Sequence, residues 1–348
     1  MFLQNQWYIA ALSKEIEEKP LGRTICAEQI VFYRTHGGQI AALPDRCPHR
    51  QAPLSKGRVV EGNIQCPYHG MEFSAQGTCV HIPSQAVVPQ RAHLQSYTVV
   101  ENDGFVWIWI GKEPAGKLPD IPELSDIESD SHAGTMFYMH AKTDYRLGVD
   151  NFLDASHVLF VHPNTVASEA VTAANTEMLV KGDEVRIRRV MPGEACSPLF
   201  KAILKSDTMD RVQDSVFRPV GHTWIETTVT LPNVKSDLVI KTRTFGLFTP
   251  ETESTCHMWT GLYRDFDIGN DKLSEIIAQQ IVRTVDEDIA ICEEVQRNWS
   301  DRTSVVHLVT DKGGLAARAI LRKLGGIEAN PAATMNFNQL EQGELQSN

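Results

Sequence analysis

The sequence predicts an α+β protein of two domains, with a small antiparallel β-domain in its N-terminal third. A length of 348 residues is enough for about two domains, each with a core of its own. Short runs rich in β-branched and aromatic residues predict strands at 30–34, 40–44, 96–101 and 105–110. A long helix is predicted from Lys272 to about Trp299, because apolar residues recur there every three to four positions.

Charge and hydropathy make two classes of partner unexpected. A net charge of -11 repels nucleic acid and anionic lipid, so neither nucleic acid nor a membrane is expected as a partner. The most apolar run, at 105–111, is far too short to span a bilayer. The first twenty residues lack the basic and apolar regions of a signal peptide, so none is expected.

The cysteines indicate a reducing compartment. There are seven, an odd number, and they are spread widely through a chain much larger than a disulfide-stabilised scaffold. We therefore expect a cytoplasmic protein whose thiols are free or bind metal. Five of them are expected to be small core residues: Cys26, Cys79, Cys196, Cys256 and Cys292.

Two mixed pairs of metal-binding residues lie between positions 47 and 69. They are Cys47-x-His49 and Cys66-x-x-His69. A structural zinc site is one interpretation, but zinc sites usually group like ligands, two Cys and then two His. In a Rieske [2Fe-2S] cluster, two Cys hold one iron and two His hold the other. One Cys and one His from each loop fit that arrangement, so the sequence predicts a Rieske cluster in the first domain.

The rest of the chain is longer than an electron carrier needs. We expect a Rieske domain at 1–112, a proline-rich linker at 113–125 and a second domain at 126–348 that uses the electrons. The polar tail, 325–348, is predicted to be disordered or to cover a neighbouring molecule.

The stretch from Asp144 to Pro163 holds the strongest candidates in the second domain. His157 and His162, with a carboxylate from elsewhere, match the facial triad of non-haem Fe(II) oxygenases. On an ideal helix they would point about 140° apart, so the helix is expected to loosen or end just before His162, as Pro163 favours. The alternative is a helix-face histidine and a capping histidine with no metal.

Acidic residues near these histidines have two predicted roles. Asp154 lies one helical turn before His157, so its carboxylate is able to accept a hydrogen bond from an imidazole. The third iron ligand is expected on the long helix, among Asp286, Glu287 and Asp288. Asp288 lies at the edge of the apolar face, which favours it modestly. The alternative is a solvated acidic cluster.

Several segments together resemble the Rieske non-haem iron aromatic oxygenases, in particular the branch of the vanillate and dicamba O-demethylases. They are NQWYIAAL, CPHRQAPLS, CPYHGMEF, YRLGVDNFLDASHVLFVH, DEDIAICEEVQ and DKGGLAARAILRKL. The resemblance implies a Rieske β-domain joined to a catalytic domain of antiparallel sheet with flanking helices.

The resemblance also implies a role for each site residue. It assigns the cluster to Cys47, His49, Cys66 and His69, and the iron to His157, His162 and Asp288. Asp154 would link a cluster histidine of one subunit to an iron histidine of the next, in a head-to-tail homotrimer. Asn151 would lie near the iron, and His257 would contact the substrate.

The implied activity is that of the terminal oxygenase of a monooxygenase system. It would O-demethylate a methoxylated aromatic acid such as vanillate, using O2 and electrons from NAD(P)H through a separate reductase, and release formaldehyde. One alternative is hydroxylation of a methyl, N-methyl or ring carbon of another aromatic or alicyclic substrate. The other is an electron-transfer Rieske protein, which would carry only the cluster irons.

Overall fold

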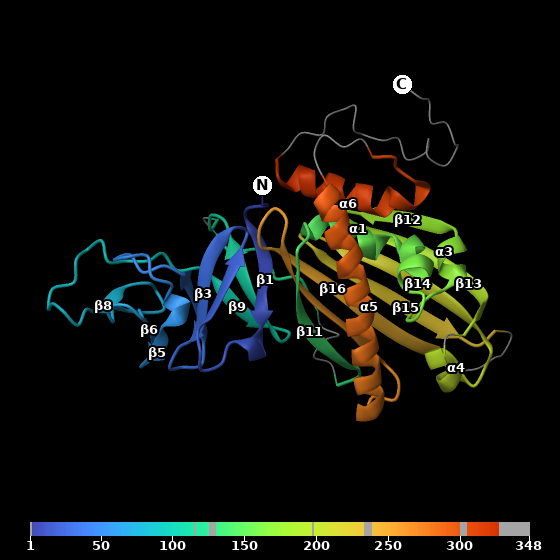
Figure 1. Ribbon diagram of the computed structural model, residues 1–348, viewed down its shortest axis with the longest axis horizontal. Coiled ribbons are helices and arrows are strands. Elements are labelled where there is room, and N and C mark those ends of the chain that lie inside the picture. Colours follow the sequence, from blue (N-terminus) through green and yellow to red (C-terminus); the bar gives the residue numbers. More distant parts are fainter. Residues whose placement is uncertain are drawn as a thin grey trace, which may run out of the picture. The chain divides into compact units, whose positions relative to one another are not determined.

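The computed structural model describes residues 2–114, 116–124, 130–196, 198–232, 239–299 and 305–326 (Figure 1). Nearly all of the predicted tail, from residue 327 on, lies outside the described residues, as do positions 115 and 125 of the predicted linker. The chain divides into two compact units. One is Met1–Glu128 with Thr249–Thr252, and the other is Ser129–Phe248 with Glu253–Asn348.

The first unit consists of small antiparallel sheets, as predicted. Their strand orders are β1-β10-β9, β2-β3-β4 and β5-β6-β7-β8. The strands are β1 (Gln6–Leu12), β2 (Leu21–Ile25), β3 (Glu28–Arg34), β4 (Ile40–Pro44), β5 (Arg58–Val60), β6 (Asn63–Gln65), β7 (Glu72–Phe73), β8 (Cys79–His81), β9 (Val99–Asn102) and β10 (Phe105–Ile110), with 3-10 turns η1 (Ser13–Glu15) and η2 (Leu54–Lys56). The predicted strands at 40–44 and 105–110 are confirmed to the residue.

The strand β10 is apolar throughout because both of its faces are covered. All six of its residues are buried, and it runs between β1 and β9 in the sheet. The indole of Trp109 meets that of Trp7 on β1 edge to face, with ring centroids 5.5 Å apart. A run such as FVWIWI, without polar alternation, is therefore the sequence of a central strand.

A short segment from late in the chain completes the first unit. Thr249 Oγ1 donates a 2.8 Å hydrogen bond to the carbonyl of Ile9, and the amide of Cys26 donates to the carbonyl of Pro250 at 2.8 Å. These bonds join residues more than 200 positions apart in the sequence, so no local pattern predicts them.

The second unit is built on a seven-stranded antiparallel sheet of order β11-β17-β16-β15-β14-β13-β12. Six consecutive strands form a meander, and β11 closes the far edge beside β17. The strands are β11 (Ala133–Ala141), β12 (Thr176–Lys181), β13 (Glu184–Ala195), β14 (Thr208–Arg218), β15 (His222–Thr230), β16 (Val239–Pro250) and β17 (Cys256–Arg264). The predicted antiparallel sheet with flanking helices is confirmed.

The helices of the second unit are α1 (Tyr145–Leu153), η3 (Ala155–His157), α2 (Val158–Val161), α3 (Glu169–Ala173), α4 (Pro198–Leu204), α5 (Asp271–Asn298), η4 (Val309–Asp311) and α6 (Lys312–Leu324). The helix α5 packs on β11 and β17 (Figure 1), within one residue of its predicted bounds. Asn270 caps its first turn by accepting from the amide of Leu273 at 3.0 Å. None of the described helices is long and apolar enough to cross a membrane.

The helix α1 docks on β16 through two reciprocal glycine–phenylalanine contacts. Gly148 of α1 faces the ring of Phe248, and Gly246 of β16 faces the ring of Phe152. The two rings meet edge to face, with centroids 5.8 Å apart. A Cβ at either glycine would overlap the facing ring, so glycine allows α1 to lie this close to the sheet.

We expect Gly246→Ala to destabilise the protein by about 1–3 kcal/mol, because the added methyl group overpacks the contact with Phe152. The free energy of unfolding in urea measures the loss. Gly269→Ala is the matched control, because a Cβ there meets nothing within 4 Å, and its effect should stay within about 0.5 kcal/mol. Equal losses in the two variants would contradict a specific role for this packing.

Candidate metal centres and substrate cavity

The two loops with the Cys–His pairs have the same backbone shape. In each loop the Cys amide donates to the carbonyl five residues on, and the Cys carbonyl accepts from the amide four residues on, at 2.8 to 3.1 Å. That fourth residue has a positive φ in both, 60° at Gln51 and 70° at Gly70. The two loops therefore present Cys47 and Cys66 in matched positions.

The donor atoms of these loops divide between the core and the surface. The thiols of Cys47 and Cys66 are buried in the same apolar cluster, whereas the imidazoles of His49 and His69 are exposed, with ring centroids 4.5 Å apart. Burial raises the pKa of the Cys47 thiol to about 11, and the neighbouring Cys66 sulfur adds to the rise. A metal ion bound by the two sulfurs would replace the thiol protons. This donor set fits a Rieske cluster whose histidine side faces solvent.

The other five cysteines lie where small core residues were expected. Cys26, Cys79, Cys256 and Cys292 are buried, and Cys196 is partly buried. All seven are free thiols.

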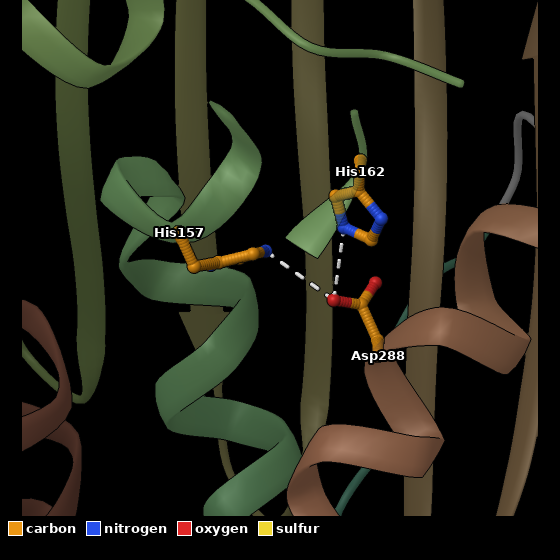
Figure 2. A group of neighbouring side chains, drawn as sticks. All are labelled: His157, His162 and Asp288. Atoms are coloured by element: carbon orange, nitrogen blue, oxygen red, sulfur yellow. Dashed lines mark ion pairs between the residues drawn. The ribbon is translucent and has the colours of Figure 1, made fainter. Parts of the chain in front are cut away.

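His157, His162 and Asp288 converge in the second unit, and Figure 2 shows both imidazoles directed at the same carboxylate. Asp288 Oδ1 lies 3.0 Å from His162 Nε2 and 3.3 Å from His157 Nε2. One ligand atom from each residue lies within 4.8 Å of the other two. Of the three acidic residues left open above, Asp288 is therefore the one that meets both histidines through their Nε2 atoms.

The protonation of this centre leaves room for a cation. His157 Nδ1 lies 2.6 Å from the carbonyl oxygen of Asp154, and His162 Nδ1 lies 2.8 Å from Glu287 Oε2. Both oxygens accept hydrogen bonds, so with a metal bound each imidazole would keep its proton on Nδ1 and leave the Nε2 lone pair for the cation beside Asp288. Two lone pairs and a carboxylate oxygen pointing at one place fit a divalent metal such as Fe(II).

The pKa values of Asp288 and His162 reflect the attraction between the carboxylate and the imidazoles. Burial alone would raise the pKa of Asp288, but hydrogen bonds from His157 and His162 outweigh it and lower that pKa to about 2. Burial alone would lower the pKa of His162, but Asp288 and Glu287 outweigh it and raise that pKa. In the absence of metal, protons hold this centre together.

Breaks in the helix bring the two histidines together. The helix α1 ends at Asp154, whose backbone is extended (φ -110°, ψ 100°). A turn of 3-10 helix then carries His157, and the single turn of α2 ends at His162 (φ -114°, ψ 48°), next to Pro163. The predicted end of the helix before His162 is confirmed, and the predicted continuous helix through His157 is broken at Asp154.

Asn151 and Asp154 hold the centre from its helical side. Asn151 Nδ2 donates to Asp288 Oδ1 at 2.9 Å. The Asp154 carboxylate accepts from the amide of Ser156 at 2.8 Å. Within one chain it is therefore the Asp154 carbonyl, rather than the expected carboxylate, that bonds an imidazole. The side chain is engaged in capping the 3-10 turn.

Glu287 is a functional candidate that sequence reasoning did not select. Its Oε2 accepts from Thr165 Oγ1 at 2.9 Å as well as facing His162 Nδ1. Asp286, by contrast, is exposed. The apolar periodicity of α5 does not distinguish these two neighbours, because the partner of Glu287 lies 125 positions away in the sequence.

A cavity of about 200 Å³ adjoins the metal centre. Its lining includes His157, His162, Asp288 and Asn151, and most of the remainder is apolar. Helices supply one wall, and β14 to β17 supply the other.

His257, the predicted substrate contact, lies on β17. It is not among the residues that line the cavity. Its Nδ1 lies 2.9 Å from Tyr138 OH, and its ring is buried beside that of Trp259. The strand β17 contributes Leu262 to the cavity. Because alternate residues of a strand face opposite sides, a residue five positions away points to the other face.

Comparison with known families identifies both units. Residues 6–97 match the model of the Rieske [2Fe-2S] domain, and residues 141–326 match that of the vanillate O-demethylase oxygenase C-terminal domain. The chain belongs to the vanillate/dicamba O-demethylase group of Rieske non-haem iron oxygenases.

Individual relatives of this group span nearly the whole chain. The dicamba O-demethylase oxygenase component of Stenotrophomonas maltophilia is 34% identical over 85% of this chain and 88% of its own. The vanillate O-demethylase oxygenase subunit of Pseudomonas sp. strain HR199 is 32% identical over 95% and 97%. A crystal structure of dicamba monooxygenase bound to dicamba superposes with a TM-score of 0.87 at 31% identity, covering 94% of this chain and 98% of that one.

Membership in the group confirms the predicted enzyme class and the Rieske domain. Its catalytic domain is of the type that holds a mononuclear iron, for which His157, His162 and Asp288 are the candidate ligands. The relatives are named as oxygenase components or subunits, which implies that those oxygenases work with a reductase partner.

We expect Glu287→Gln to weaken iron binding at the mononuclear centre by about 10-fold to 100-fold, because a neutral amide holds the His162 Nδ1 proton less firmly than a carboxylate does. Competition against a calibrated chelator measures the affinity. Asp286→Asn removes the adjacent exposed charge and should leave the affinity unchanged. A similar loss in both variants would point to net charge on α5 instead of the bond to His162.

Proposed function

We propose that the protein is the terminal oxygenase of a monooxygenase system and O-demethylates a methoxylated aromatic acid such as vanillate. The substrate loses its methyl group as formaldehyde. In balance, ArOCH3, O2, NAD(P)H and a proton give ArOH, formaldehyde, NAD(P)+ and water. A separate reductase supplies the electrons to the Rieske cluster.

The observation that carries this proposal is the three-ligand centre at the wall of an apolar cavity. Two histidines and one carboxylate leave ligand positions open on the cavity side. The cavity is of a size for one aromatic ring with small substituents, and its apolar lining favours a ring over a sugar or a peptide.

When bound, the cluster supplies single electrons and the mononuclear Fe(II) supplies O2 activation. The chain's own part is to place a methoxy carbon near the open ligand positions and to exclude water. Asn151 fixes the Asp288 carboxylate by its 2.9 Å hydrogen bond, while the Asp154 carbonyl and Glu287 fix the tautomers of the two histidines.

We further propose that the working form is a cytoplasmic homotrimer in which Asp154 passes electrons between subunits. The residue adjoins the iron ligand His157 through its carbonyl, at 2.6 Å. Its carboxylate uses Oδ1 for the Ser156 amide, and Oδ2 accepts no hydrogen bond from the described residues. In the proposed trimer, that oxygen accepts from an exposed histidine of another subunit's cluster loops, His49 or His69.

The test is formaldehyde release from a panel of methoxybenzoates, including vanillate, with a reductase and NADH. We expect one or more acids to give formaldehyde and the corresponding phenol in equal amounts. Ring hydroxylation without formaldehyde would favour the alternative oxygenase reaction.

Two variants separate the metal sites. Asp288→Ala should keep a reducible cluster and lose turnover, and Cys66→Ser should lose the cluster irons alone. An iron content of two per wild-type chain, in place of three, would favour a plain electron carrier.

For the bridge, we expect Asp154→Asn to keep all its iron and to slow electron transfer by orders of magnitude, because a neutral amide links the imidazoles less firmly. The rate of cluster reoxidation in a single turnover with substrate and O2 measures this. Loss of iron would show that Asp154 is a ligand instead.

Mixed trimers decide whether transfer crosses subunits. An Asp154→Asn chain offers an intact cluster, and a Cys66→Ser chain offers an intact Asp154 beside its iron. Activity should recover when the two are mixed. Proven subunit exchange without recovery would place the electron path within one chain.

A further inference from the structure

The cavity holds one permanent cation. Among the described residues that line it, Arg211 on β14 is the only arginine or lysine. Its Nη2 donates to Glu194 Oε1 at 2.5 Å and to Ser168 Oγ at 3.2 Å. Its side chain is largely buried, with 13% exposed. Burial of a guanidinium is costly unless its charge and its donors are paired, and the bonds to Glu194 and Ser168 both use Nη2.

Two polar atoms beside this cation are unpaired among the described residues. Arg211 Nε and Gln213 Oε1 are both buried, and no group in the described part of the chain hydrogen-bonds to either of them. An unsatisfied buried polar atom typically costs about 1–3 kcal/mol, and such atoms are rare in native proteins. Since both residues line the cavity, a molecule bound there is able to reach the Arg211 Nε–H and the Gln213 amide group.

The strands arrange these atoms on one polar wall. Arg211 and Gln213 are two positions apart on β14, so they face the same side of the sheet. Gln213 pairs with Thr227 on β15, which in turn pairs with Thr242 on β16. All four residues line the cavity, whereas the metal ligands come from η3, the end of α2 and α5. The polar groups and the metal centre therefore belong to opposite walls.

Glu194 leaves part of the guanidinium available. It meets Arg211 through the single oxygen Oε1, and its second oxygen, Oε2, has no hydrogen-bond partner within the described ranges. A guanidinium carries five N–H donors in a rigid fork, so an edge held by one carboxylate leaves Nε–H for a second acceptor. Glu194 orients Arg211 and does not block the Nε side.

We propose that Arg211 and Gln213 bind the acid group, a carboxylate or sulfonate, of an aromatic substrate. This rests on the proposed oxygenase function of the same cavity. One acid oxygen accepts from Arg211 Nε–H, and the Gln213 amide, turned about its last bond, donates to the other. The acid end then lies at the sheet wall and the ring extends toward the helical wall, where the methyl group meets the metal centre.

The test is equilibrium binding to the iron-loaded protein under anaerobic conditions, measured by calorimetry. The probes are matched pairs that differ only at the acid, such as vanillate and vanillamide, or 3-methoxybenzoate and 3-methoxybenzamide. We expect at least one acid to bind more tightly than its amide. Arg211→Met should raise the Kd of that acid about 10-fold to 100-fold and leave the Kd of its amide within a few-fold.

Three further variants make the result specific. The double variant Arg211→Met with Glu194→Gln removes the cation and the anion together, so that no unpaired buried charge affects folding. It should lose the preference for the acid over its amide in the same way as Arg211→Met. Gln213→Met should weaken acid binding by about 10-fold or less. Arg188→Met removes an arginine of β13 that pairs with Asp214 away from the cavity, and it should change neither Kd.

The proposal is overturned if no acid of the panel binds more tightly than its amide, or if the preference survives both Arg211 variants. This outcome is distinct from failure of the oxygenase function. Binding without formaldehyde release would overturn O-demethylation and leave the acid site standing. Formaldehyde release with equal efficiency from acids and amides would overturn the acid site and leave O-demethylation standing.

Discussion

The catalytic unit depends on one oxygen atom, Asp288 Oδ1. It accepts from Asn151 Nδ2 at 2.9 Å and faces His162 Nε2 at 3.0 Å and His157 Nε2 at 3.3 Å. These contacts tie α5 to α1 and to the short turns after it, across more than 120 positions of sequence. A carboxylate with a pKa of about 2 keeps its charge at any physiological pH. The same point that attracts a metal therefore also holds the helical wall of the cavity together when metal is absent.

The sequence predicted those features that depend on residues close together in the chain. Alternation and apolar periodicity predicted β4, β10 and α5, because burial of one or both faces dictates those patterns. The end of the helix before His162 followed from the proline after it. The partners of these elements did not follow, because Glu287 meets His162 and Asn151 meets Asp288 only after α5 has packed beside α1.

Strand parity decides which side chains of the sheet face the cavity. A resemblance transfers residue types, but it does not transfer the face of a strand. His257 lies on β17 at an odd separation from the cavity residue Leu262, and its Nδ1 meets Tyr138 OH. Arg211 and Gln213 were overlooked because a charged strand residue usually faces solvent. Only the sheet register shows that they share the cavity face with Thr227.

Asp154 shows how a break in a helix allows one residue to serve two neighbours. In a continuous helix its carbonyl would accept from the amide of Val158, four residues on. The extended backbone at Asp154 releases that carbonyl, which then meets His157 Nδ1 at 2.6 Å. The carboxylate caps the 3-10 turn by accepting from the amide of Ser156 with Oδ1. A helix-favouring sequence at this position would lose both arrangements together, since the tautomer of His157 and the direction of the carboxylate follow from the same pair of backbone angles.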